Sequence, residues 1–250
     1  MTLTITPFDA PIGAEVTGVD LRDPLDQTSV DQIYQAWLDH IVLIFRDQSL
    51  SKDEQVAFSN QFGDVGIRAT PKEEQNEFAN GYDGTIMLVT NQRDEKGNYI
   101  GSLQDGEMWF HHDMCYDKAP HKGTFLYAME LPSTGGNTLF ANMYAAYDRL
   151  SDDMKERVKG QRALQIYDFA TRETVDISDD ISKYKHEVQS VTITHPVTGR
   201  RALYVNPLIT ARIEDMPEDD SRAMLDELFA FADDPSIAYE HEWRLGDLLL

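Results

Sequence analysis

Cysteine, basic residues and long apolar runs are all scarce in this 250-residue chain, and each shortage excludes a class of function. Cys115 is the only cysteine, so the chain can form neither an internal disulfide nor a cysteine-based zinc or iron–sulfur site. Lysine and arginine together number 22 against 44 acidic residues, and the formal net charge is −22 at pH 7. Such a negative field repels phosphate backbones and anionic lipids, so we expect no nucleic-acid or membrane partner.

Targeting and membrane signals are missing as well. The N-terminal sequence MTLTITPFDAPIGAEV has neither the basic start nor the apolar stretch of a signal peptide, and no apolar run reaches 18 residues. These features predict a soluble cytoplasmic protein. The length and the hydrophobic content of 41% predict a single domain over residues 1–250 with a sizeable core.

Strand-like runs outnumber helical patterns along the chain. Helices are predicted after a cap at Thr28 or Ser29, after the capping box of Ser51 and Glu54, and over residues 219–233. Short strands are predicted at residues 41–45, 85–89, 124–129, 138–141, 163–167, 191–194, 202–205 and 248–250. Strict alternation of strands and helices is absent. The pattern therefore predicts a mainly β fold with helical decoration, of the jelly-roll or a related barrel type.

The chemistry-bearing residues that remain are histidines and carboxylates, because the common nucleotide, hydrolase and zinc-protease motifs are absent. Of the seven histidines, only His111 has an acid two residues further on, at Asp113. On an extended segment both side chains would point to one face and could bind one ion, while His112 would point away. Two such ligands and a distant histidine form the facial triad of non-heme iron oxygenases. Taken alone, however, the pattern favours an ordinary hydrogen bond between the two side chains.

Four regions around this pair carry a resemblance to a known family. They are IGAEVTGVDL at residues 12–21; IVLIFR at 41–46 with SKDEQVAFSNQFGDV at 51–65; FHHDMCY at 110–116 with ELPSTGGNTLF at 130–140 and NMYAAY at 142–147; and THPVTGR at 194–200 with ALYVN at 202–206. With these regions the chain resembles the taurine/2,4-D dioxygenase (TauD/TfdA) family of iron(II)- and 2-oxoglutarate-dependent dioxygenases along nearly its whole length. The resemblance implies a double-stranded β-helix, or jelly roll, flanked by helices, in agreement with the strand pattern.

The resemblance also implies site residues and a reaction. His111 and Asp113 would bind iron(II), and Thr138 would hydrogen-bond a carboxylate of 2-oxoglutarate. Asn91 and Glu107 are predicted to line the substrate pocket. The implied reaction consumes 2-oxoglutarate and O₂, releases succinate and CO₂, and hydroxylates or otherwise oxidises an unactivated C–H bond of a small organic substrate. The carboxylate of Asp113 favours hydroxylation, because related halogenases carry glycine or alanine at that position.

The last residues and the remaining histidines complete the predictions. Residues 243–250, WRLGDLLL, resemble a strand that in family members leads into a W-D-N-R segment with the distal metal histidine, and then to an arginine that pairs with 2-oxoglutarate. We therefore expect the third ligand and this arginine beyond Leu250, so that the domain as printed lacks its C-terminal strands. If the chain ends there, His241 is the alternative third ligand. Otherwise His241 and His186 are predicted to be surface residues and His195 a structural one.

Two other functional classes stay open at this point. One is a non-catalytic jelly-roll protein that binds a small molecule such as a sugar. The other is a cupin-type metal hydrolase or isomerase that uses His111, Asp113 and another histidine. Iron-dependent consumption of 2-oxoglutarate would distinguish the dioxygenase from both. The expected partner is a small-molecule substrate, and a homo-oligomer also stays open.

Overall fold

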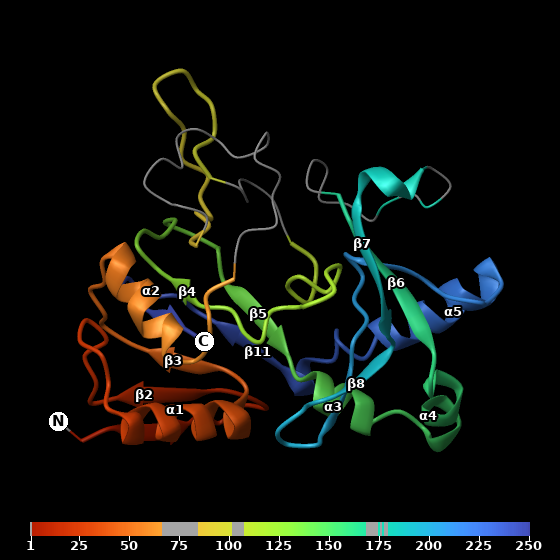
Figure 1. Cartoon of the computed structure of the whole chain (residues 1–250), viewed down its shortest axis with the longest axis horizontal. Helices are drawn as coiled ribbons and strands as arrows, with labels where there is room; N and C mark the ends of the chain where they lie inside the picture. The colour runs from red at the N-terminus through yellow and green to blue at the C-terminus, as the bar shows by residue number, and fades with distance from the viewer. Residues whose placement is uncertain (1, 67–84, 102–107, 169–174, 176, 178–179) are drawn as a thin grey trace.

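The computed structural model describes residues 2–66, 85–101, 108–168, 175, 177 and 180–250, which form four sheets and five α-helices (Figure 1). A five-stranded sheet has the order β1-β2-β3-β12-β4, a three-stranded sheet the order β10-β6-β7, and two further sheets pair β11 with β5 and β8 with β9. The strands are β1 (Thr4–Pro7), β2 (Ala14–Thr17), β3 (Leu43–Phe45), β4 (Leu126–Tyr127), β5 (Thr138–Ala141), β6 (Arg162–Tyr167), β7 (Lys185–Ser190), β8 (Thr192–Thr194), β9 (Arg201–Leu203), β10 (Thr210–Ile213), β11 (Ala238–His241) and β12 (Leu248–Leu249). The α-helices are α1 (Gln27–His40), α2 (Lys52–Asn60), α3 (Met143–Asp148), α4 (Asp152–Val158) and α5 (Glu218–Phe229), and two 3₁₀ helices are η3 (Ile181–Lys183) and η4 (Pro235–Ile237).

Strands β3 and β12 lie in the middle of the five-stranded sheet and are buried on both faces. Leu43 and Phe45 belong to the core cluster that packs beneath α1 and α2, whereas Ile44 faces a second cluster on the other side of the sheet. In β12, Leu248 and Leu249 divide between the same two clusters. Burial on both faces explains why these strands consist of uninterrupted apolar residues.

The first two helices begin at side-chain caps. The capping box that opens α2 is present as predicted: the Ser51 amide donates to Glu54 Oε2 over 2.7 Å, and the Glu54 amide donates to Ser51 Oγ. For α1 the predicted cap was wrong, because the side chain of Asp26 accepts from the Ser29 amide. No helix in the described part of the chain combines the length and the apolar character required to cross a membrane.

The second half of the described chain packs around β6. Figure 1 shows β6 and β7 as long neighbouring strands on the side of the molecule away from α1 and α2, with β5 and β11 lying between the two groups. Strand β6 pairs antiparallel with both β7 and β10, and α5 packs against β10. Leu203 of β9, Ile213 of β10 and Leu228 of α5 are fully buried in a cluster to which β6, α3 and α4 also contribute. Strands β5 and β11 thus occupy a central position between two cores.

Seven of the eight predicted strands are present with small shifts of their ends, and the described chain combines mixed sheets with helices. The prediction of a strand at residues 85–89 was wrong, because these residues are irregular. The sequence patterns missed β1, β2, β7, β10 and β11 and the short helices α3 and α4. Strands such as β1 and β7 face solvent over much of their length, so they lack the apolar run that signals a buried strand.

Gly246 offers a test of how tightly the turn before β12 is packed. Its φ is +82°, and a Cβ atom there would lie 2.6 Å from the carbonyl oxygen of Gln48. Gly160 has a similar φ of +76° but open space around it, which makes it a matched control. We expect Gly160→Ala to lower the free energy of unfolding by about 1 kcal/mol through backbone strain alone. Gly246→Ala should lower it by about 2–4 kcal/mol, because the carbonyl must also move. Urea denaturation measures the free energy of unfolding of both variants. Equal losses would contradict the close packing of Gly246 against the Gln48 carbonyl.

Candidate functional site

His111 and Asp113 lie side by side in the structure. His111 Nε2 is 3.3 Å from Asp113 Oδ1, and the two side chains keep 29% and 44% of their surface exposed. Asp113 Oδ2 accepts a hydrogen bond from the hydroxyl of Thr124, which lies just before β4. The pair is therefore accessible, and one carboxylate oxygen is held while the other faces the imidazole. Nothing in the sequence pattern marked Thr124, because its contact with Asp113 depends on the fold.

The hydrogen bonds of His111 determine which ring nitrogen can bind a ligand. The backbone carbonyl of Trp109 can only accept, so His111 Nδ1 donates to it over 2.8 Å. Nε2 is then the nitrogen that faces Asp113. Burial opposes the charged imidazolium, but hydrogen bonds to Asp113 and to the Trp109 carbonyl outweigh it and raise the pKa of His111. Burial likewise disfavours the carboxylate, yet hydrogen bonds from His111 and Thr124 lower the pKa of Asp113.

The two donors fit a divalent metal ion. First-row ions such as zinc bind imidazole nitrogen and carboxylate oxygen at about 2.0–2.2 Å, so two ligands at right angles lie about 3 Å apart. The observed separation of 3.3 Å is close to this value. The bond from His111 Nδ1 to a carbonyl is also the usual way in which proteins orient a metal-binding imidazole. In the described ranges, no third His, Cys, Asp or Glu side chain groups with such a pair.

The backbone that carries the pair differs from the extended segment that the sequence predicted. Residues 108–112 have no regular secondary structure, and a turn covers residues 113–116. Met114 has a φ of +58°, in the left-handed region, and the Asp117 amide donates to its carbonyl oxygen over 2.9 Å. His111 and Asp113 still converge, so the prediction that their side chains share one face agrees with the geometry. A loop rather than a strand provides it.

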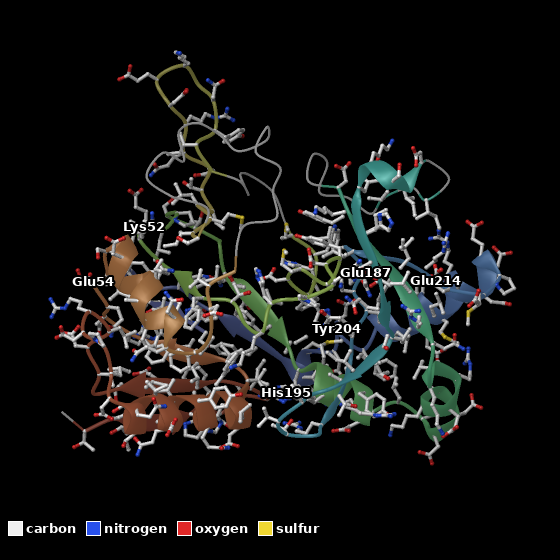
Figure 2. All side chains as sticks on the ribbon, in the orientation of Figure 1. Lys52, Glu54, Glu187, His195, Tyr204 and Glu214 are labelled. Carbon is white, nitrogen blue, oxygen red and sulfur yellow. The ribbon has the colours of Figure 1, made fainter. Side chains whose placement is uncertain are left out.

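A buried polar network holds this loop against β6 and β10. His112 packs its ring against Tyr204, with the centroids 4.7 Å apart, and its Nδ1 lies 3.4 Å from the side-chain amide of Asn206. Asn206 also donates to the sulfur of Cys115, whose thiol donates to Gln165 Oε1. Figure 2 labels Tyr204 in the centre of the molecule, between the two groups of strands. The residues on either side of Asp113 are thus anchored in the interior, while Asp113 itself faces solvent.

Thr138, the predicted 2-oxoglutarate residue, begins strand β5. The preceding turn contains Gly135 and Gly136, with φ values of +73° and +80° that favour glycine. The hydroxyl oxygen of Thr138 accepts a hydrogen bond from the indole N–H of Trp243 over 3.0 Å. Antiparallel pairing of β5 with β11 places Thr138 opposite His241. The sequence analysis missed Trp243, although it lies within the resembling segment at residues 243–250.

His241 is fully buried, so the prediction that it is a surface residue was wrong. Its Nε2 lies 3.1 Å from Asp247 Oδ2, and its Nδ1 lies 3.0 Å from the hydroxyl of Tyr239. Burial and the neighbouring Arg46 lower the pKa of His241, which favours the neutral ring. Both ring nitrogens therefore have partners other than His111 and Asp113, and among the described residues His241 does not group with these two side chains as the alternative third ligand. Sequence patterns could not indicate this burial, because Arg46 lies far from His241 along the chain and joins it only in the folded structure.

The other predicted residues have varied outcomes. Asn91 is exposed on an irregular segment and not at the end of a strand, and Glu107 lies outside the described residues. His186 is exposed, as predicted. His195 Nδ1 accepts from the amides of Val197 and Thr198 in the turn between β8 and β9, which agrees with a structural role. Figure 2 shows His195 at the lower edge of the molecule.

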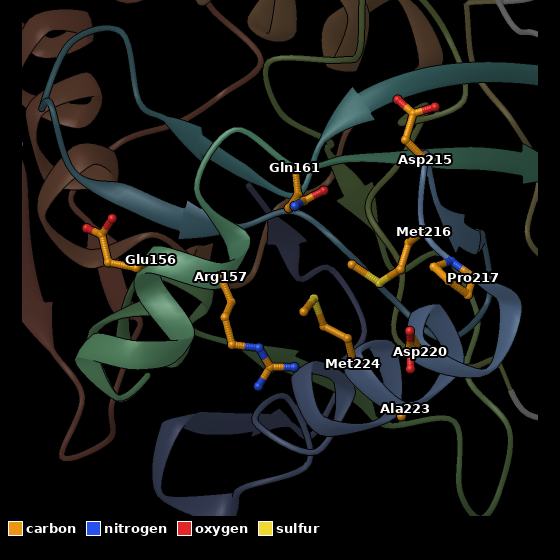
Figure 3. Close-up of a pocket in the computed structure, with 9 residues that line it drawn as sticks. All are labelled: Glu156, Arg157, Gln161, Asp215, Met216, Pro217, Asp220, Ala223 and Met224. Carbon is orange, nitrogen blue, oxygen red and sulfur yellow. The ribbon is translucent and has the colours of Figure 1, made fainter.

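A hollow of about 690 Å³ lies between α4 and the start of α5, as Figure 3 shows. Its lining includes Arg157, Met216 and Met224 together with the carboxylates of Asp215 and Asp220. None of the predicted site residues lines it. The hollow is therefore separate from the candidate site at His111 and Asp113.

The chain resembles known proteins over nearly its whole length. Residues 4–250 match the model of the family described as "Taurine catabolism dioxygenase TauD, TfdA family". Pentalenolactone F synthase from Streptomyces avermitilis is 36% identical over 270 residues, covering 100% of this chain and 85% of that protein. The (S)-phenoxypropionate/alpha-ketoglutarate-dioxygenase of Sphingobium herbicidovorans is 31% identical over 255 residues, covering 98% of this chain and 85% of that protein.

Solved structures show the same relationship in three dimensions. AAD-2 in complex with Mn(II) and N-oxalylglycine superposes with a TM-score of 0.78 at 27% identity, covering 100% of this chain and 87% of that one. A taurine dioxygenase from Burkholderia xenovorans gives a TM-score of 0.75 at 26% identity, with 99% of this chain and 78% of that one covered. The first of these structures holds a metal ion together with N-oxalylglycine, an analogue of 2-oxoglutarate.

The environment of Cys115 predicts its reactivity. Burial is the main cause that raises the pKa of the thiol to about 12, so almost no thiolate is present at pH 8. We expect a thiol reagent such as DTNB to react with the folded protein more than about a hundredfold more slowly than with the same protein in guanidinium chloride. The absorbance of the released thiolate measures both rates. Rapid stoichiometric labelling of the folded protein would contradict the buried network around Cys115.

Proposed function

This chain belongs to the TauD, TfdA family of dioxygenases, and on that premise we propose that His111 and Asp113 are two of the iron(II) ligands of a 2-oxoglutarate-dependent dioxygenase. The observation that carries the proposal is the accessible pair formed by His111 Nε2 and Asp113 Oδ1, 3.3 Å apart. A family match over residues 4–250 and structural neighbours over the whole chain favour this function over a binding protein or a cupin-type hydrolase.

The chemistry divides between the cofactor and the protein. When bound, iron(II) supplies the oxidation chemistry by which 2-oxoglutarate, O₂ and a substrate C–H bond become succinate, CO₂ and an oxidised product. His111 provides Nε2 because the Trp109 carbonyl holds the hydrogen on Nδ1. The Thr124 hydroxyl donates to Asp113 Oδ2, so Oδ1 is the carboxylate oxygen that faces the His111 imidazole. The protein thus orients one nitrogen and one oxygen, which is a common way to reduce the reorganisation needed on metal binding.

Thr138 is the proposed donor to a carboxylate of 2-oxoglutarate. Its hydroxyl oxygen already accepts from Trp243, so the hydroxyl hydrogen is available for an anion. We propose that strands β5 and β11 form part of a double-stranded β-helix, as the structural neighbours suggest. The third metal ligand and the arginine for 2-oxoglutarate, expected beyond Leu250, stay predictions, as do the roles of Asn91 and Glu107.

The side chains next to the metal pair favour a substrate with an apolar body. Trp109, two residues before His111, keeps 59% of its surface exposed. Met108 and Met114 pack against the aromatic cluster that includes Tyr116. Relatives named for (S)-phenoxypropionate and 2,4-dichlorophenoxyacetate act on compounds that combine an aromatic ring with a carboxylate. We therefore propose a small, largely apolar organic acid as the substrate.

Replacing either metal ligand should abolish the reaction. We expect His111→Ala and Asp113→Ala each to reduce iron-dependent succinate formation by at least about a thousandfold, since the site loses one of few metal ligands. The exposed His186 provides a matched control, and His186→Ala should keep the activity of the original chain. Succinate is measured by chromatography with and without added Fe(II). Activity of either ligand variant equal to that of the control would reject the site.

Trp109→Ala tests the proposed substrate class. If the indole contacts an apolar substrate, its loss should raise the KM for a phenoxyalkanoic acid by about tenfold, as expected for the removal of a large aromatic contact. The KM for 2-oxoglutarate should not change. Succinate formation above the substrate-free rate with phenoxypropionate, but not with taurine, is the expected preference. Selective stimulation by taurine would overturn the apolar substrate and leave the dioxygenase assignment intact.

A further inference from the structure

The hydrogen bond between Trp243 and Thr138 can have only one direction. An indole N–H is a donor and never an acceptor, so the Thr138 oxygen must accept it. A threonine hydroxyl has one hydrogen to donate and two lone pairs to accept with. With one lone pair occupied by Trp243, the hydroxyl keeps its hydrogen for another partner. Accepting a hydrogen bond also polarises the hydroxyl and strengthens it as a donor.

The Trp243 ring is itself held from two sides. It packs with Phe140 against the apolar cluster behind the five-stranded sheet. It also meets the ring of His241 edge to face, with centroids 4.5 Å apart and an interplanar angle of 87°. Tyr239, His241 and Trp243 alternate along one extended run, so their rings follow one another on the same side of the chain.

The His241 ring is fixed by a buried ionic cluster. Asp247 has no exposed surface and its Oδ2 contacts His241 Nε2, the Arg46 guanidinium and the backbone amide of Arg244. Tyr239 holds the other nitrogen of His241. A charged cluster of this kind is costly to bury, and it restricts the ring to one orientation. The cluster makes no contact with the metal pair in the described residues, so the reaction chemistry gives it no role.

We propose that Trp243 is a positioning residue for the co-substrate, and that its indole N–H presets the Thr138 hydroxyl as a donor to a carboxylate of 2-oxoglutarate. Asp247 binds both Arg46 and His241, and the His241 ring that it fixes holds Trp243 in the required orientation. This inference rests on the proposed role of Thr138. Because Trp243 acts through a binding contact, its loss should raise the KM for 2-oxoglutarate much more than it lowers kcat.

The test is a double-mutant cycle with Trp243→Phe and Thr138→Val, read out by binding. Phenylalanine keeps an aromatic ring but lacks the N–H, and valine keeps the shape of threonine but lacks the hydroxyl. The probe is N-oxalylglycine, titrated by calorimetry into the Zn(II)-loaded full chain, since zinc is redox-inactive. Trp37→Phe is the matched control, because Trp37 lies on α1 and packs in the other core cluster.

We expect Trp243→Phe to weaken binding of N-oxalylglycine by about fivefold to tenfold in the original chain, as for the loss of one hydrogen bond between neutral groups. In the Thr138→Val background the same change should alter the affinity by less than about twofold, because the tryptophan then has no hydroxyl to orient. An equal loss in both backgrounds, or no loss in the original chain, would overturn the inference. If Thr138→Val alone leaves the affinity unchanged, it is the proposed role of Thr138 that fails.

A second measurement does not depend on the stability of the tryptophan variant. The chain has three tryptophans, so ¹⁵N labelling of tryptophan gives three indole resonances. The Trp243 resonance should shift in Thr138→Val and, in the original chain, on addition of N-oxalylglycine, while the Trp37 resonance stays in place. A Trp243 resonance that responds to neither change would overturn the inference, even if Trp243→Phe fails to fold.

Discussion

The carboxylate of Asp247 links the five-stranded sheet, through β3 and β12, to strand β11 of a separate sheet. Asp247 precedes β12, Arg46 follows β3, and His241 ends β11, and all three side chains meet at Asp247 Oδ2. The carboxylate is completely buried, and its Oδ1 has no hydrogen-bond partner among the described residues. Removing one member of such a cluster leaves an uncompensated charge in the interior, which typically costs about 3–5 kcal/mol. The five-stranded sheet and the pair β5–β11 are therefore held in one relative position.

Both parts of the candidate site depend on this framework, by different routes. Thr138 lies on a strand whose partner ends in His241, so its position follows from backbone pairing. His111 and Asp113 lie on a loop, where the fold must supply fixed geometry through side chains. Thr124 ties Asp113 to the start of β4, and the buried partners of His112 tie the same loop to the interior. Precise placement on a loop requires such anchors, since loops lack the backbone ladder that holds a strand.

The sequence predicted those features that arise from local patterns. The capping box of Ser51, the uninterrupted apolar run of β3 and the His111–Asp113 spacing all involve neighbouring residues, and each corresponds to a feature of the structure. The burial of His241 could not be predicted, because its partner Arg46 reaches the cluster only after the chain folds. The exposed strands were missed for a related reason: pairing to a neighbour defines them, and their own composition does not.

The position of β12 bears on how the protein folds. This strand lies between β3 and β4, and the Arg46–Asp247 contact that accompanies it spans 201 residues of chain. Closing so long a loop is slow, and topologies with distant contacts fold more slowly than those with local ones. During synthesis, β3 emerges from the ribosome long before β12. Until β12 is made, the edge of β3 with which it pairs stays exposed. Such an edge can pair with other chains. The nascent chain is thus most vulnerable to aggregation, and most dependent on chaperones, until residues 248–249 have been made.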